Sequence, residues 1–147
     1  MRRLEDTDPV PGVLAHLRQD GHVGALLRGG HIGGVRDAPW PCLVVAAASD
    51  NAGGGRGGPV TRGVSFTLYD SFEEAYGPWA ARRCLLAVVQ SVVAMAEADT
   101  PQDPTEPIFC GVIADGQLYD MRATSGQMRY LTEVQFTMAP AEESPAP

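Results

Sequence analysis

The sequence predicts an α+β fold: a mainly antiparallel sheet of four to five strands, with a long helix and a shorter N-terminal helix packed on one side. Three observations support this prediction. Apolar and polar residues alternate from Gly63 to Asp70, as in a half-buried strand. The longest amphipathic run in the chain follows, from Pro78 to Ala98, and a second alternating strand covers residues 128–138.

Length and composition predict one domain that needs neither a disulfide nor a metal for its core. The chain has 147 residues, no lysine and a net charge of −7, which argues against a nucleic-acid binder held by a basic surface. Cys42, Cys84 and Cys110 form no CxxC pair and lie in apolar stretches, so we expect reduced core thiols. No stretch reads as a signal peptide or a membrane span, and we therefore expect a protein without a membrane role that is made in the cytoplasm.

The first third of the chain predicts two short helical segments and then strands. Residues 1–8 are charged and are expected to be flexible, and the domain itself is expected to cover 9–138. A helix is expected after Pro9, and Asp20 is placed to cap a second helical turn that Gly29 and Gly30 end. The next segments are an expected short edge strand over 31–35 and a central strand over 42–48, apolar on both faces and so expected to be covered on both sides.

Residues 51–63 contain six glycines and predict a flexible loop between two antiparallel strands. A phosphate-binding loop is excluded because the Gly-Lys-Ser/Thr ending is missing and the next segment is a strand. Two readings remain open for this loop. It is a plain linker, or it becomes ordered against a partner, with Arg56 and Arg62 forming charge-assisted hydrogen bonds across the contact.

The long helix should restart near Pro78, after an initial turn in which Ser71 and Glu74 have the spacing of a capping box. Its expected buried stripe recurs at spacings of three and four residues: Trp79, Leu85, Leu86, Val89, Val92, Val93 and Ala96. Arg82 and Arg83 are expected on the side that faces solvent or a partner.

The last third predicts a hairpin and a final strand. Residues 108–114 and 117–123 flank Asp115-Gly116, a strong signal for a tight hairpin turn, and Ser125-Gly126 predicts another turn. The strand over 128–138 should place Tyr130, Val134 and Phe136 on one face. Residues 139–147 are rich in proline, alanine and glutamate and are expected to be a flexible tail.

The sequence offers no active site. His16 and His22 are six residues apart and would point to different helix faces, so they predict no shared metal site. The acidic pairs lie at helix ends or in links, and no histidine is placed to activate a cysteine. We therefore expect no enzyme activity, no catalytic residue, no cofactor and no metal, and we favour an interaction protein.

The order of segments resembles the tail terminator, or tail-completion, proteins of long-tailed bacteriophages. The residues that carry the resemblance are the opening helix with Leu26-Leu27 and Gly29-Gly30, His31-Ile32, 37–39, 41–45, the strand 64–70, the helix 80–96 and the closing 134–136. The match covers roughly residues 10–138 and contains no catalytic motif. The Gly77-Pro78 break and the glycine-rich 51–63 loop depart from the family pattern.

The resemblance implies a structural virion protein that assembles as a homohexameric ring. Such a ring caps the tail tube at its head-proximal end, stops tube growth, and provides the docking surface for the head or neck, with the tube protein and a neck protein as partners. DNA would pass through the ring without being read. The candidate assembly residues are Arg56, Arg62, Arg82 and Arg83. Two alternatives are a neck or head-closure protein of the same virion and a non-viral intracellular binding domain.

Overall fold

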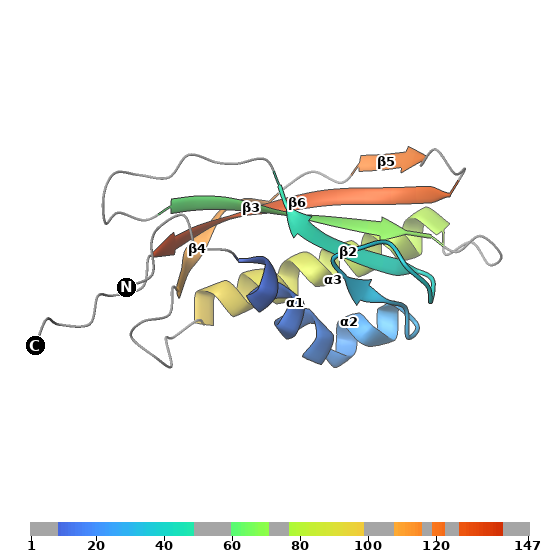
Figure 1. Ribbon diagram of the computed structural model, residues 1–147, viewed down its shortest axis with the longest axis horizontal. Coiled ribbons are helices and arrows are strands. Elements are labelled where there is room, and N and C mark those ends of the chain that lie inside the picture. The colour runs from blue at the N-terminus through green and yellow to red at the C-terminus, as the bar shows by residue number, and fades with distance from the viewer. Residues whose placement is uncertain are drawn as a thin grey trace, which may run out of the picture.

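The computed structural model describes residues 9–48, 60–70, 77–98, 108–115, 119–122 and 127–139. Within these ranges the chain forms three helices and six strands (Figure 1). In chain order they are α1 (Val10–Gln19), α2 (Gly21–Leu26), β1 (Ile32–Gly33), β2 (Cys42–Ala47), β3 (Val60–Tyr69), α3 (Gly77–Ala98), β4 (Ile108–Asp115), β5 (Tyr119–Arg122) and β6 (Met128–Ala139). The α+β class is confirmed, and the helices lie together on one side of the sheet (Figure 1).

The sheet is mixed, which corrects the expectation of a mainly antiparallel sheet of four to five strands. Its strand order is β1-β2-β3-β6-β4, and β5 pairs with β6 beside this path, giving six strands in the described ranges. β1 is parallel to β2, whereas β2, β4 and β5 each pair antiparallel with a neighbour. The parallel pair arises because β1 has only two residues, and residues 34–41 bring the chain back to start β2 in the same direction.

The hairpin predicted at Asp115-Gly116 is wrong. β3 pairs with β6 along almost the full length of β6, from Arg129 to Met138, and so occupies one edge of that strand. β4 and β5 both pair antiparallel with the other edge, β4 with residues 134–139 and β5 with residues 128–131. The two strands therefore run in the same direction as successive parts of one edge. The hairpin partner of β5 is β6 itself, and the Ser125-Gly126 turn lies outside the described residues.

The core lies between the sheet and the helices. From Val64 to Leu68, every second residue of β3 is buried, and Tyr130, Val134 and Phe136 of β6 join them. Both predicted alternations are confirmed, because a strand sends successive side chains to opposite faces. β2 differs from its prediction, since its intervening side chains Val44 and Ala46 are only half-buried. The helices cover one face of the sheet, so β2 is covered fully on that face alone.

α3 packs on the sheet through a stripe that differs in part from the predicted one. Its buried residues are Ala81, Cys84, Leu85, Ala87, Val88, Val89, Val92 and Ala96. Leu85, Val89, Val92 and Ala96 are confirmed, and Val93 packs partly against the core. The prediction is wrong for Trp79 and Leu86, which have 82% and 58% of their surfaces exposed. Residues 85 and 86 differ by about 100° around a helix, so one can face the sheet while the next faces solvent.

The N-terminal helices form as predicted. α1 buries Val13 and Leu17, and α2 begins at the Asp20 cap, whose carboxylate accepts the amide protons of His22 and Val23 at 2.9 Å and 3.1 Å. A second carboxylate organises the start of α3. Asp70, at the end of β3, is 3% exposed, and its Oδ2 accepts the amide proton of Gly77 at 3.1 Å. The backbone N–H of Asp70 donates to Met128 O at 2.9 Å, so α3 starts beside the start of β6.

Two expectations of the sequence concern edges and termini. β1 lies at one end of the strand order, which confirms the edge strand predicted over 31–35, and β4 lies at the other end. The domain limits and the two flexible termini stay predictions, and residues 1–8, the 49–59 loop and residues 140–147 lie outside the described ranges. By length and composition, α3 is the helix among the described residues that could cross a membrane; core helices pass the same test, and α3 carries a buried stripe against the sheet.

Candidate assembly interface

One face of α3 exposes large side chains that a monomer would ordinarily cover. Trp79 and Leu86 are the most exposed large apolar residues of the helix, and Arg82 and Arg83 lie exposed between them. Positions 79, 82, 83 and 86 recur every three or four residues, so they form a single stripe. We call these four residues the outer stripe. Protein interfaces are richer in tryptophan and arginine than the rest of a protein surface, and the outer stripe combines both with an aliphatic side chain.

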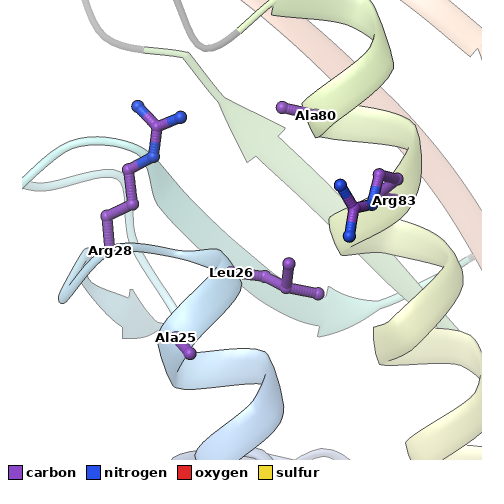
Figure 2. Close-up of a pocket in the computed structure, with 5 residues that line it drawn as sticks. All are labelled: Ala25, Leu26, Arg28, Ala80 and Arg83. Atoms are coloured by element: carbon purple, nitrogen blue, oxygen red, sulfur yellow. The ribbon is translucent and has the colours of Figure 1, made fainter.

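A small pocket lies at the edge of the outer stripe, between α2 and α3. Arg83 and Ala80 of α3 line one side, and Ala25, Leu26 and Arg28 line the other, around a volume of about 130 Å³. Figure 2 shows Leu26 pointing toward α3, with the guanidinium groups of Arg28 and Arg83 on opposite sides of the opening. Small-molecule sites typically enclose about 300–1,000 Å³. This pocket therefore suits a single side chain rather than a cofactor.

The end of α2 brings Arg28 to the pocket. Arg28 and Gly29 both have left-handed backbones, with φ of 54° and 77°, and the chain turns sharply there. Gly30 then passes against Pro41, the residue before β2: its N–H donates to Leu27 O at 2.9 Å, and a Cβ built on it would lie 1.8 Å from Pro41 O. No side chain fits at that approach. The glycine pair predicted to end the helix is thus also what fixes the position of Arg28.

A polar link holds α1 and α2 against α3. The hydroxyl of Ser91 on α3 donates to Asp20 Oδ2, and His16 Nε2 on α1 lies 2.8 Å from Ser91 Oγ. Because the hydroxyl proton goes to the carboxylate, the imidazole N–H is the donor to Ser91. The Ser91 hydrogen bond is the main cause that lowers the pKa of Asp20. The Val23 and His22 amides and the charge of His16 act in the same direction, against desolvation.

This His-Ser-Asp arrangement is not a nucleophile with its base. A catalytic serine donates to a histidine that the acid orients, whereas here Ser91 donates directly to Asp20. Cys42 and Cys84 are buried, reduced thiols, as predicted, and burial is the main cause that raises the pKa of Cys42. Cys110 lies in β4 and its side chain is outside the described part. No group of three metal-ligating side chains occurs among the described residues.

The structure describes three of the four predicted assembly residues and places them at two different positions. Arg82 and Arg83 lie together on the outer stripe, near the start of α3. Arg62 belongs to β3 rather than to the predicted loop and pairs with Phe136, near the far end of β6. Arg56 lies outside the described residues. Arg62 is eight residues from Asp70, about 26 Å along a strand, so it lies at the opposite end of β3 from the start of α3, and its role in assembly stays a prediction.

Sequence reasoning missed two parts of this interface. The helical spacing places Trp79 and Leu86 in the predicted core, and the sequence predicts no role for the α2 side of the pocket. The neighbouring arginines were the available signal. A tryptophan three and four residues from Arg82 and Arg83 shares their helix face, and a face with two arginines is a poor candidate for burial.

Comparison with known proteins gives a structural match. No family model matches the chain, and no curated protein matches it. A chain from a solved structure of the virion of a native gene transfer agent particle superposes with a TM-score of 0.64. The match covers 90% of this chain and 98% of the other, at 18% sequence identity. At that identity the match establishes a shared fold.

Proposed function

We propose that this chain is a structural protein of a phage-like virion, and more narrowly that it is a tail terminator. The observation that carries the proposal is the shared fold with a chain of a gene transfer agent virion over nearly the whole of both chains. The order of segments, which resembles tail terminators, supports the narrower assignment. Such a protein acts by shape and contact. The Asp20 carboxylate already accepts a hydrogen bond from Ser91, and the thiols of Cys42 and Cys84 are buried. Both features agree with a role without catalysis.

The function we propose is a homohexameric ring at the head-proximal end of the tail. The ring binds the last layer of tube protein, ends tube growth, and presents its other face to the neck, while DNA passes through its centre. Ring contacts are heterologous, so each subunit needs two different surfaces. Three surfaces of the described part are candidates for them: β1 at one end of the strand order, β4 and β5 at the other edge of the sheet, and the outer stripe.

The experiment combines assembly with a growth assay. Tube protein is polymerised with and without this chain, and tube length is measured by negative-stain microscopy while native mass spectrometry counts subunits. We expect sixfold species and tubes that stop growing. A double variant, W79S/R83S, should fold normally but fail to assemble, because it removes the aromatic and charged centre of the outer stripe. Q19A, an exposed change at the end of α1 and outside the outer stripe, is the matched control.

The second candidate is a neck or head-closure protein of the same virion. The structural match favours it as well, because the matched chain belongs to a whole virion particle. The two candidates differ in what the purified protein binds: a terminator binds tail tubes, whereas a neck protein binds the portal end of heads. A chain that stays monomeric and binds neither structure would overturn the virion proposal and leave the non-viral binding domain.

A further inference from the structure

The charges of this chain are unevenly distributed between its described and remaining parts. The described ranges hold eight of the eleven arginines but only seven of the eighteen acidic residues. The acidic excess therefore lies in the connecting and terminal segments. The eight residues that follow β6 contain Glu142, Glu143 and three prolines, with no cationic residue. Residues 1–8 are less suited to bind arginines, since they place two arginines beside three acidic residues.

We propose that residues 140–147 of one copy bind the pocket and outer stripe of the next copy, with Glu142 or Glu143 between Arg28 and Arg83. This inference rests on the proposed ring and names the contact that closes it. The arrangement in Figure 2, two guanidinium groups beside an opening lined by Ala25, Leu26 and Ala80, is complementary to a glutamate. The carboxylate receives the guanidinium forks, and the two methylene groups cover the apolar lining.

The exposed tryptophan extends the same site. Trp79 directly precedes Ala80 of the pocket and is 82% exposed. Proline-rich segments dock on aromatic surfaces because their extended conformation is already restricted, so little further order is lost on binding. Pro140 and Pro145 flank the two glutamates. A segment laid along α3 can thus place a proline on Trp79 while a glutamate enters the pocket.

Geometry requires that the bound segment come from another copy. α3 starts beside Met128, where β6 begins, and β6 then runs for 12 residues, about 36 Å, to Ala139. Figure 1 shows the start of α3 and the end of β6 at opposite ends of the molecule. Arg83 is only about 9 Å along α3 from its start, whereas Glu143 is four residues beyond Ala139 and reaches about 14 Å. Glu143 therefore cannot reach the pocket of its own chain.

A contact between one end of a subunit and the opposite end of its neighbour is heterologous, which is the type that builds rings. Each contact is small, and ordering the segment costs free energy, so a single contact should be weak. Six contacts in a closed ring act together and make the whole assembly stable. The site would thus favour complete rings over pairs of subunits.

The test exchanges charges between the two sides of the contact. R82E/R83E reverses the charge of the outer stripe, including Arg83 of the pocket, and E142R/E143R reverses the charge of the segment. Each variant alone should associate about tenfold more weakly than wild type in sedimentation velocity, because a charge-assisted pair is replaced by repulsion. An equimolar mixture of the two variants should recover association, because each reversed surface then meets its complement on another chain. A contact within one chain would not be restored by mixing.

Controls and a second readout make the outcomes decisive. D103R/E106R introduces the same charge change in another acidic segment and should associate like wild type. Thermal melts by circular dichroism check that every variant folds. In a W40F background, Trp79 fluorescence should become less accessible to acrylamide as concentration rises, and E142R/E143R should abolish that protection.

If wild type and both reversed variants all form rings equally well, the segment contact is wrong and the ring stands. If the reversed variants fail but their mixture does not recover, the contact is also overturned. If wild type does not associate even with tail tubes present, both the contact and the proposed ring fall.

Discussion

Two adjacent leucines on α3 provide a direct test of which helix face is buried. Leu85 is 2% exposed and belongs to the core, whereas Leu86 is 58% exposed on the outer stripe. We expect Leu85→Ala to lower the free energy of unfolding by about 2–5 kcal/mol, because it removes buried methyl groups and leaves a cavity. The same change at Leu86 should cost less than about 1 kcal/mol. Only about two-fifths of its surface is buried, and alanine favours the helix by a few tenths of a kcal/mol.

Urea unfolding of the isolated chain measures both values. With an m value of about 2 kcal/mol per molar, a loss of about 3 kcal/mol moves the midpoint for Leu85→Ala down by roughly 1.5 M. The Leu86→Ala midpoint should move by less than about 0.5 M. Leu86→Asp extends the comparison, since the charge would stay in water and cost little, whereas Leu85→Asp would bury an unpaired charge. Equal losses at the two leucines, or a larger loss at Leu86, would refute the placement of the outer stripe.

Three further predictions concern contacts that hold the fold together. Ser91→Ala should lower the free energy of unfolding by about 1–2 kcal/mol, because Asp20 loses a partly buried hydrogen bond. The pKa of Asp20 is lowered in the folded state, so the stability that Asp20 contributes is present above its unfolded pKa and is lost as pH falls through its folded pKa. Urea midpoints measured from pH 7 to pH 3 should therefore fall less steeply in Ser91→Ala than in wild type. Gly30→Ala should lower the free energy of unfolding by about 2 kcal/mol or more in the same assay, because the new Cβ would lie 1.8 Å from Pro41 O. Its control, Gly24→Ala, has open space around the new Cβ and should be neutral or mildly stabilising. Asp70→Ala should lower the free energy of unfolding by about 1–3 kcal/mol, and the amides at the start of α3 should be the first to lose their protection from hydrogen exchange. Protection that remains there would contradict the capping role of the Asp70 carboxylate.

The sequence alone was sufficient where a pattern is local. The alternation in β3 and β6 predicts which residues are buried because a strand has a period of two whatever it pairs with. The Asp20 cap was predictable for the same reason, since its carboxylate bonds to amides two and three residues away. The limits of α3 follow from the proline signals on either side, and the order of helix, strands, long helix and strands is enough to predict the α+β class.

The tertiary structure decided every feature that depends on a distant partner. Asp115-Gly116 has good turn chemistry, yet β4 and β5 stay in line because the edge of β6 offers pairing to both of them, and that gain is invisible in the local sequence. Trp79 and Leu86 fit the spacing of a buried stripe, but the face of α3 that meets the sheet runs through Leu85 and Val88. The pocket needs α2 and α3 side by side, which the link from His16 through Ser91 to Asp20 fixes across 71 or more residues of sequence. Local chemistry thus determined which segments form helices and strands, whereas packing between segments far apart in the chain determined which surfaces remain exposed to bind a partner.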